Sequence, residues 1–416
     1  MTPPHWFAIA VGCTPEPAPL IDVDEVVDLA ALGYLDFADA PEAENDEGGV
    51  VLRATGADDK FYTLVTSRNL RRTDLIDADG NRLRRWYDPM TGYWARARLM
   101  PNGDLVVAGQ DAVAPYLLRL TWNGRERWRS DVAAHHDIHP MTEGRVATML
   151  YRDRRIQEVE RFFDLRDDFI AIIGPRGRVM EEISVWAALS AAPEHFTFQD
   201  AGLWVGDGRV KDLLHTNTIQ FLDDAELAAR DPLFQVGRVL VTLRNQDAVA
   251  LIDWETRKVV WSWGQGTLLG PHDGTIMPNG NLLVLDNGVG RGWSRVLEVE
   301  PHTGEIVWRY QGDPPSSFYT ASRGSAQRLP NGNTLITESD RARLFEVDPN
   351  GQIVWEFLNP AQEGQRATIS RAERMDIATV EVVWRALECS SGTEEDDDTL
   401  DGSLAQLPDE YEEDSP

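Results

Sequence analysis

Histidines stand in three segments that each open a predicted β unit. They occur in HHDIHP (135–140), LLHTNTI (213–219) and GPHDG (270–274), which together hold five of the eight histidines of the chain. A single histidine in a loop is most often a polar surface residue, but equivalent positions in three successive units point to a shared site. Arg244 follows one strand after the second segment. These residue types predict a site with several imidazoles and one guanidinium.

Two kinds of chemistry suit such a set of residues. Neutral imidazoles bind zinc or copper, but no cysteine joins them, and an arginine in the same site disfavours a cation. Arginine and histidine donors can instead bind a tetrahedral oxyanion, while a further imidazole acts as a nucleophile or general base. The residues therefore favour anion chemistry, and we expect neither a metal nor a cofactor.

The elements that position these residues are predicted from two repeated patterns. One pattern, an aliphatic strand, a turn with Asp and Gly, and a second strand with Trp, recurs at 250–263, 296–310 and 344–357. The other is a Pro-Asn-Gly turn between strands, and its PNGN copies begin at Pro278 and Pro330, 52 residues apart. Four short antiparallel strands per unit at this period are typical of a β-propeller.

We therefore expect an all-β fold, a six-bladed β-propeller of four-stranded antiparallel blades, with short helical insertions and a disordered acidic C-terminal tail. Each repeated tryptophan is expected to pack between neighbouring blades. The predicted blades span 58–90, 92–132, 135–190, 213–265, 270–312 and 320–360.

The third unit is the least regular, and a short helix is expected near its end. Another helix is expected at 223–231, and the segment 378–387 is expected to supply a closing strand. The resulting domains are a leader and N-terminal cap at 1–57, the propeller at 58–387 and the acidic tail at 388–416.

Charge and composition narrow the classes of partner. The net charge of -29 argues against nucleic acid and anionic membrane surfaces, because an acidic surface repels polyanions. Cys13 and Cys389 lie near opposite ends and form neither a metal site nor a disulfide framework. No apolar run has the length of a transmembrane helix. The short apolar stretch before Cys13 has no basic residue in front of it, so export and a cytoplasmic location both stay open.

Five stretches between residues 62 and 360 carry the histidines, Arg244 and their surroundings: HHDIH, DLLHTNTI, LVTLRNQDAVALID, PHDGTIMPNGNLLVLDNGVGRGWSRVLEVEP and RGSAQRLPNGNTLITESDRARLFEVDPNGQIVWE. Together they resemble the bacterial and archaeal arylsulfotransferase family. The resemblance implies a six-bladed propeller enzyme that moves a sulfuryl group from a phenolic sulfate ester to another phenol without a nucleotide sulfate donor. It further implies ping-pong kinetics through a sulfohistidine, small-molecule partners and a periplasmic or extracytoplasmic location.

The resemblance also implies roles for single residues. His272 matches the histidine that attacks sulfur and becomes sulfated. His215 and Arg244 match residues that hold the sulfate oxygens. His136 matches the histidine of the first loop, with His135 as the alternative counterpart. The candidate site residues are therefore His272, His215, Arg244 and His136 as catalytic residues, with Asn217 and His135 binding substrate.

Some features depart from the family, and other functions stay open. The leader is not a convincing export signal, and the N-terminal region lacks an evident donor-strand or dimerisation domain. A quinoprotein-like propeller shares the Asp-Gly-Trp pattern but would usually have eight units and a calcium site of carboxylates, neither of which the sequence indicates. A propeller that only binds partners predicts that His272→Ala leaves function intact.

Overall fold

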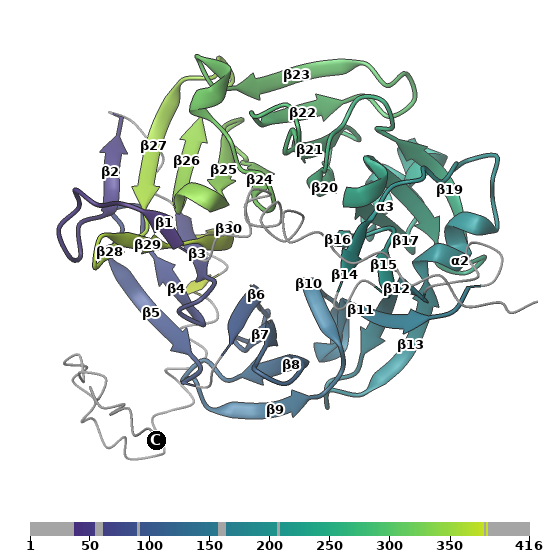
Figure 1. Cartoon of the computed structure of the whole chain (residues 1–416), viewed down its shortest axis with the longest axis horizontal. Helices are drawn as coiled ribbons and strands as arrows, with labels where there is room; N and C mark the ends of the chain where they lie inside the picture. The colour runs from purple at the N-terminus through teal and green to yellow at the C-terminus, as the bar shows by residue number, and fades with distance from the viewer. Residues whose placement is uncertain are drawn as a thin grey trace, which may run out of the picture.

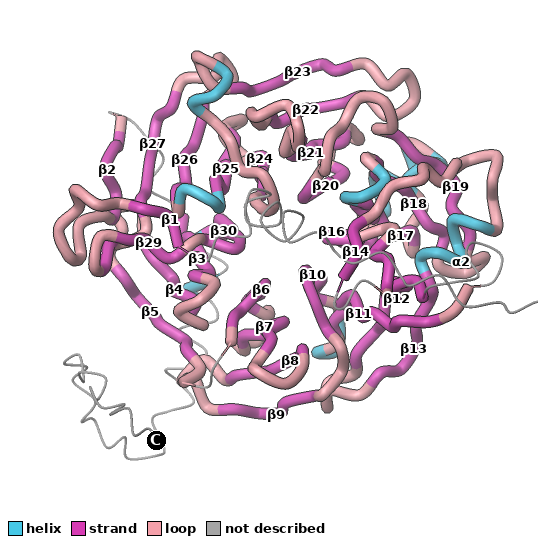
Figure 2. The backbone as a smooth tube through the Cα atoms, viewed as in Figure 1, coloured by secondary structure: helices cyan, strands magenta, loops and turns pink. Residues whose placement is uncertain are grey.

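The chain is almost entirely β-structure in the part that the computed structural model describes, which comprises residues 37–54, 61–89, 92–156, 164–205, 209–377 and 380–381. The helical segments there are short (Figure 2). Both predicted helices are present, as α2 (Val185–Ser190) and α3 (Ala225–Arg230). The expected all-β fold with short helical insertions is confirmed. The predicted acidic tail at 388–416 lies outside the described residues.

Four of the sheets have four antiparallel strands each. Most of their neighbouring strands are joined by tight turns in which Gly or Asn adopts a positive φ or caps the turn. The four sheets consist of β3 (Phe61–Ser67), β4 (Arg72–Ile76) and β5 (Arg82–Tyr87) with β30 (Ile369–Asp376); β6 (Tyr93–Leu99), β7 (Leu105–Gln110), β8 (Pro115–Leu120) and β9 (Glu126–Ser130); β16 (Thr216–Phe221), β17 (Arg238–Leu243), β18 (Ala248–Asp253) and β19 (Lys258–Trp263); and β20 (His272–Ile276), β21 (Leu282–Asp286), β22 (Arg295–Val299) and β23 (Ile306–Gln311).

Two larger sheets depart from the uniform four-stranded pattern that was expected. One has six strands: β10 (Ala134–Pro140), β11 (Val146–Arg154), β12 (Asp164–Ile173), β13 (Val179–Ser184), β14 (Leu203–Val205) and β15 (Val210–Asp212). The long β12 pairs with β13 over one half and with β15, in parallel, over the other half. The other sheet has five strands: β2 (Gly49–Arg53), β24 (Ser325–Arg328), β25 (Thr334–Glu338), β26 (Arg343–Val347) and β27 (Ile353–Leu358). A small three-stranded sheet joins β1 (Phe37–Asp39), β28 (Ala361–Gln362) and β29 (Gln365–Ala367).

The larger sheets are arranged like the blades of a propeller around a common centre (Figure 1). The strands nearest to this centre are β6, β10, β16, β20, β24 and β30. Those at the periphery are β5, β9, β13, β19, β23 and, beyond β27 in the same sheet, β2. Neighbouring inner strands contact each other in that order around the centre. Side chains at the ends of six chain segments that are distant in the sequence therefore converge at the centre.

Repeated tryptophans tie five of the six larger sheets to the following sheet. The indole N–H on an outer strand donates a hydrogen bond to a carbonyl in a turn of the following sheet, at 2.9–3.2 Å. The predicted packing of these tryptophans between neighbouring sheets is thus confirmed, and the hydrogen bond satisfies the one polar atom that a packed indole carries. The five donors are Trp86, Trp128, Trp261, Trp308 and Trp355.

The ring is closed by a C-terminal strand that lies earlier in the chain than predicted. β30 pairs along the whole length of β3. Of the segment 378–387, which was expected to supply a closing strand, Val380 and Glu381 have helical backbone and the rest lies outside the described residues. The sequence analysis missed β30 because of its composition, ISRAERMD. Arg371 and Glu373 of this strand line cavities at the centre, so the strand lacks the apolar face that marks most strands in a sequence.

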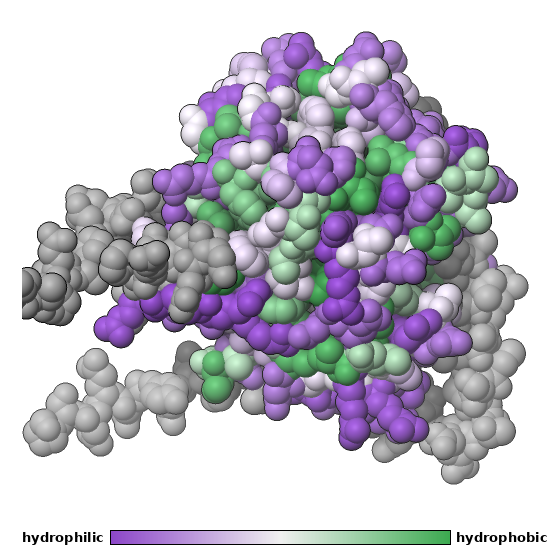
Figure 3. All heavy atoms as spheres, turned by 90° about the vertical axis from the view of Figure 1, so that its right-hand side faces the viewer, coloured by the Kyte–Doolittle hydropathy of each residue, from purple (hydrophilic) through white to green (hydrophobic). Residues whose placement is uncertain are grey.

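The outer surface is mixed in character. Figure 3 shows hydrophilic and apolar residues intermingled on the side of the molecule that carries α2 and β19. The exposed apolar side chains of the described residues include Val179, Met180, Trp204 and Val236. Scattered apolar residues of this kind are normal on a protein surface and do not indicate a binding site.

Candidate active site

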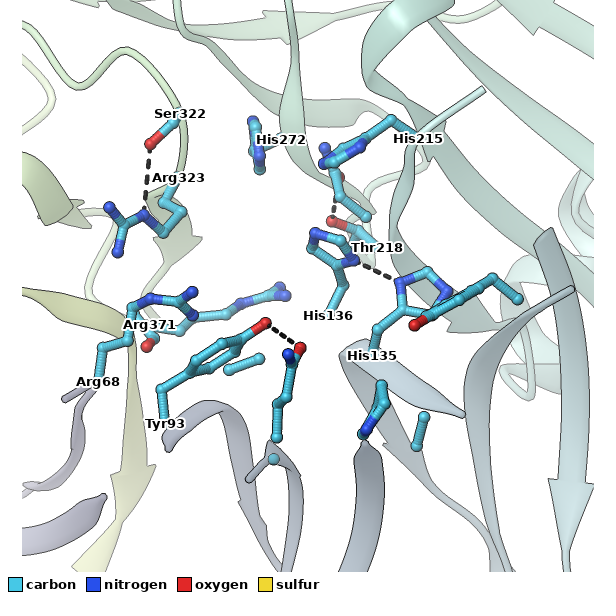
Figure 4. Close-up of a pocket in the computed structure, with 18 of the residues that line it drawn as sticks. Arg68, Tyr93, His135, His136, His215, Thr218, His272, Ser322, Arg323 and Arg371 are labelled. Atoms are coloured by element: carbon cyan, nitrogen blue, oxygen red, sulfur yellow. Dashed lines mark hydrogen bonds between the residues drawn. The ribbon is translucent and has the colours of Figure 1, made fainter. Parts of the chain in front are cut away.

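Five of the six candidate residues line one pocket at the centre of the ring. His135, His136, His215, Asn217 and His272 surround a cavity of about 240 Å³ (Figure 4). They come from the starts of β10, β16 and β20 or from the residue just before. The structure therefore brings together the three histidine segments that the sequence places far apart.

Local irregularities of the inner strands aim these side chains at the centre. The pairing registers of β10, β16 and β20 each shift next to the histidine segment. His136, His215 and Asp273 there have φ values of 58°, 47° and 54°. Such values are unusual for residues other than glycine and are frequent at functional sites. β-bulges of this kind redirect side chains at the ends of strands.

His272 is held in one orientation by Asn287, which follows β21. The Nδ1 atom of His272 lies 2.8 Å from Oδ1 of Asn287. The Nδ2 atom of Asn287 donates to the carbonyls of Thr320 and Arg323, both at 2.7 Å, so its Oδ1 must be the acceptor. Nδ1 of His272 therefore carries the ring proton, and Nε2 keeps its lone pair.

The environment of His272 also keeps its ring neutral. Burial, together with the positive charge of Arg244, holds the pKa of His272 well below the ordinary value of 6.5. Within the described part of the chain, Nε2 of His272 has no hydrogen-bond partner. A neutral, oriented imidazole with an available nitrogen is suited to nucleophilic attack.

Arg244, the sixth candidate, lies next to His272 but does not line the pocket itself. It is 4% exposed and begins the short 3-10 segment after β17. Its Nη1 donates to Oδ1 of Asn245 at 2.8 Å. Its Nε and Nη2 are buried with no hydrogen-bond partner among the described residues. These two nitrogens form one edge of the guanidinium, the edge that binds an oxyanion with two parallel hydrogen bonds.

His215 is anchored by a carboxylate that the sequence analysis did not single out. Asp212 accepts hydrogen bonds from the backbone N–H of His215 at 2.9 Å and from its ring Nδ1 at 2.6 Å. Burial is the largest single influence and would raise the pKa of Asp212, but His215, Arg166 and His135 together outweigh it, so that this pKa is lowered. An ionised Asp212 therefore fixes the ring of His215, as carboxylates fix histidines in other active sites.

His135 and His136 form the opposite part of the histidine cluster. Their Nδ1 atoms are in hydrogen-bond contact, and the rings of His136 and His215 lie 4.8 Å apart between centroids (Figure 4). Burial lowers the pKa of His135 to about 4 and holds that of His136 well below 6.5, with the neighbouring histidines adding to the effect. Nε2 of His135 lies 3.6 Å from Oδ1 of Asp168. Both rings are neutral near pH 7.

The pocket has charged and aromatic residues that the sequence analysis missed. Asp212 and Thr218 stand in the quoted segment DLLHTNTI, on either side of His215, so both could have been noticed. The others come from loops and strands whose position at the centre no local pattern reveals. The missed residues are Arg68, Tyr93, Tyr151, Arg166, Asp168, Asp212, Thr218, Ser322, Arg323 and Arg371.

A buried ion cluster supports the histidine strands from one side. Arg371 pairs with Asp137, at 3.2 Å, and with Asp273. Asp137 also accepts from the backbone N–H of Ile219 at 3.1 Å, and Asp273 accepts from that of Ala326 at 2.8 Å. These bonds join inner strands of different sheets. Arg371 also lines a second cavity of about 640 Å³, so the cluster lies between two cavities of the central region.

The described residues contain neither a metal-binding cluster nor a membrane-spanning helix. No group of three or more His, Cys, Asp or Glu there is arranged to hold a metal ion. None of the helices in that part of the chain combines the length and the apolar character needed to cross a membrane. His139, the remaining histidine of the first segment, does not line the pocket but lies against Phe221, with 5.8 Å between ring centroids.

The sequence matches the model of a known protein family. The sequence model of the family described as Arylsulfotransferase (ASST) matches residues 98–360, which is more than half of the chain. This range contains all six candidate residues. No curated protein matches the chain.

Solved structures are similar to this chain at low sequence identity. A protein of unknown function from Bacteroides caccae is 14% identical with a TM-score of 0.50, covering 76% of this chain and 99% of its own. A catalytically inactive virginiamycin B lyase from Staphylococcus aureus with quinupristin is 13% identical with a TM-score of 0.43, covering 77% and 87%. The β-propeller domain of Cps50 (Swd1) from Myceliophteria thermophila is 13% identical with a TM-score of 0.45, covering 79% and 90%.

Proposed function

Because the chain belongs to the arylsulfotransferase family, we propose that it moves a sulfuryl group from a phenolic sulfate ester to another phenol by way of a sulfated His272. Membership of the family supports sulfotransferase activity in general. The phenolic substrates, the covalent intermediate and the independence from a nucleotide sulfate donor belong to the proposal. The interpretation of the six larger sheets as the blades of a six-bladed propeller spanning 58–387 is also part of the proposal.

The observation that carries the proposal is the fixed tautomer of His272. Asn287 holds the ring proton on Nδ1, and burial keeps the ring neutral, so the lone pair of Nε2 is available at neutral pH. The amide of Asn287 is itself fixed by two carbonyls, so its oxygen stays directed at Nδ1 of His272.

In the first step, Nε2 of His272 attacks the sulfur of the donor. An N–S bond forms, the S–O bond to the aryl group breaks, and the phenolate leaves with the electron pair and takes up a proton from solvent. Phenolate is a good leaving group because a phenol has a pKa of about 10, as in tyrosine. Sulfuryl transfer resembles phosphoryl transfer, in which the protein mainly positions the reactants and stabilises charge on the equatorial oxygens.

In the second step, an acceptor phenol replaces the first product. Its hydroxyl proton passes to the neutral ring of His136, its oxygen attacks sulfur, and the N–S bond breaks with its electron pair returning to Nε2 of His272. His136 then releases the proton to solvent. Asn287 supports this step because a proton kept on Nδ1 lets His272 leave as a neutral imidazole instead of an imidazolate anion.

Two residues are proposed to hold the sulfuryl oxygens during both steps. Arg244 offers its buried Nε and Nη2 edge next to His272. His215 is fixed by Asp212 and lines the same pocket. Donors that are already oriented before the reaction stabilise developing charge with little reorganisation. Asn217 is held by the carbonyl of Pro271, next to His272, and lies beside the transferring group.

A turnover assay with a chromogenic aryl sulfate tests the proposal. We expect the wild-type protein to release nitrophenolate from 4-nitrophenyl sulfate in the presence of a phenol acceptor, and His272→Ala to lose this release. His302→Ala is the matched control, because His302 is a 56% exposed histidine that pairs with Asp231 away from the pocket. Release that survives in His272→Ala, or no release from several donors by the folded wild type, contradicts the proposal.

A further inference from the structure

The turn that carries Arg244 is bonded to the loop that carries His215. This turn is the 3-10 segment Arg244–Gln246, which follows β17. The backbone N–H of Arg244 donates to the carbonyl of His215 at 3.2 Å. The next backbone N–H, that of Asn245, donates to the carbonyl of Leu214 at 3.0 Å. The two residues proposed to hold the sulfuryl oxygens therefore lie on segments with a fixed separation.

The same part of the chain also contacts the loop that leads to His272. Oδ1 of Asp247, the residue after the turn, accepts from the backbone N–H of Gly270 at 2.7 Å. Gly270 has a φ of 66°, and a Cβ atom placed on it would lie 3.9 Å from Cγ of Arg244. The side chain of Arg244 therefore lies against this loop, two residues before the proposed nucleophile. Its influence on the pKa of His272 agrees with this position.

The side chain of Asn245 connects the guanidinium of Arg244 to the loop before His215. Its Oδ1 accepts from Nη1 of Arg244 at 2.8 Å. Its Nδ2 donates to the carbonyl of Asp212 at 2.7 Å, so the orientation of the amide is fixed and Oδ1 must be the acceptor. Asp212 is also the residue whose carboxylate fixes the ring of His215. One amide therefore links both proposed oxygen-holding residues.

The bond to Asn245 decides which nitrogens of Arg244 remain available. It engages Nη1, whereas Nε and Nη2 are buried and have no hydrogen-bond partner among the described residues. Buried charged donors without partners are costly, and an anion bound at this edge would remove the cost. Nε and Nη2 together can bind two oxygens of one anion. A guanidinium free to rotate would not keep this edge in place.

We propose that Asn245 is a positioning residue that directs the Nε and Nη2 edge of Arg244 toward a sulfate-like oxyanion beside His272. Asn245 does not line the pocket, so it acts on the anion through Arg244. This inference rests on the proposed function, in which Arg244 holds the sulfuryl oxygens. Donors that are fixed before the anion arrives need little reorganisation, so the loss of Asn245 weakens anion binding although no group that touches the anion is removed.

Binding of inorganic sulfate tests the inference without turnover. We expect Asn245→Ala to raise the dissociation constant of sulfate about tenfold in isothermal titration calorimetry, as loss of a residue that orients a binding group does in other sites. Asn279→Ala is the matched control, because Asn279 also accepts one hydrogen bond and donates one, but in an exposed turn outside the pocket. An unchanged dissociation constant in Asn245→Ala, or no sulfate binding by the folded wild type, overturns the inference.

A double-mutant cycle separates positioning of Arg244 from general support of the fold. The measured quantity is kcat/KM for 4-nitrophenyl sulfate in the wild type, Asn245→Ala, Arg244→Met and the double variant. We expect Asn245→Ala to lower kcat/KM about tenfold in the wild type. In the Arg244→Met background it is expected to change kcat/KM by less than about twofold, because no guanidinium is left to position. An equal loss in both backgrounds shows that Asn245 acts independently of Arg244 and overturns the inference.

Asn245→Asp provides a second variant if the alanine variant misfolds. The carboxylate has nearly the size of the amide and can still accept from Nη1 of Arg244. It neutralises the charge that binds the anion, and when ionised it cannot donate to the carbonyl of Asp212. We expect the dissociation constant of sulfate to rise by at least about tenfold in this variant. A constant equal to that of the wild type overturns the inference.

These experiments also distinguish this inference from the proposed function. If sulfate binding weakens in Asn245→Ala but the wild type transfers sulfuryl groups from no aryl sulfate, the proposed function fails and the positioning role of Asn245 stands. If the wild type performs the transfer but sulfate affinity is equal in the wild type and Asn245→Ala, the function stands and Asn245 has no positioning role.

Discussion

Replacing Asn287 with alanine tests whether the tautomer of His272 controls its reactivity. The substitution removes the closer acceptor of the Nδ1 proton, 2.8 Å away, and leaves only the carbonyl of Gly270 at 3.2 Å. The loss of a hydrogen bond by a buried donor costs about 1–3 kcal/mol. That cost falls on the reactive tautomer alone, because the other tautomer carries its proton on Nε2.

The expected loss of rate follows from this energy. Since about 1.4 kcal/mol corresponds to a factor of ten, the ratio of the reactive tautomer to the other one falls by roughly 5- to 150-fold. We expect the burst of nitrophenolate in a single-turnover experiment without acceptor to slow by up to that factor. The affinity for the aryl sulfate is expected to change much less, because Asn287 does not line the pocket.

Two further variants distinguish this effect from general damage. Asn281→Ala is the matched control, because Asn281 binds Glu298 near the PNGN turn of the same sheet and lies outside the pocket. Asn287→Asp keeps an acceptor for Nδ1 but adds a negative charge, which raises the pKa of His272 and moves the acid limb of the burst rate to higher pH. A folded Asn287→Ala variant with a wild-type burst rate refutes the reasoning.

Three more predictions follow from the same geometry. Arg244→Met removes the buried Nε and Nη2 edge beside His272, and kcat/KM for the aryl sulfate is expected to fall by about 10- to 1,000-fold; a value within twofold of the wild type contradicts this role. Asp212→Asn removes the carboxylate that fixes His215. We expect kcat/KM for the aryl sulfate, measured across pH, to fall by about tenfold. An unchanged rate and pH profile would show that His215 needs no such support. Burial lowers the pKa of His139 from 6.5 to about 4, so the unfolded chain binds a proton that the folded chain does not, and stability is lost as pH falls below about 6.5. In urea unfolding, His139→Asn is expected to lose about 2 kcal/mol less than the wild type between roughly pH 7.5 and 5, and an equal loss in both proteins contradicts the prediction.

The features that repeat in the sequence could be predicted, because repetition reports a common local structure. The Pro-Asn-Gly turns and the tryptophans mark equivalent hairpins, and the structure has strands and hydrogen bonds at those places. The histidine segments were predicted to converge because each opens a unit, and His136, His215 and His272 do meet in one pocket.

Other features could not be predicted because they depend on contacts between distant segments. Arg68 precedes β4 and Arg323 precedes β24, and only closure of the ring brings them opposite the histidines. Asn287 stands at the end of a strand, where an asparagine is usually part of a turn. Two further features follow no local pattern. The charged strand β30 depends on its position at the centre of the ring. The parallel pairing of β12 with β15 depends on the length of β12.

The most direct test of the account is the mass of the protein after reaction with an aryl sulfate in the absence of acceptor. We predict that the intact chain gains one SO3 group, that peptide fragmentation places this group on His272, and that addition of a phenol removes it and yields the new aryl sulfate. Turnover without any covalent label, or a label on His136 or His215 with His272 unmodified, would contradict the account.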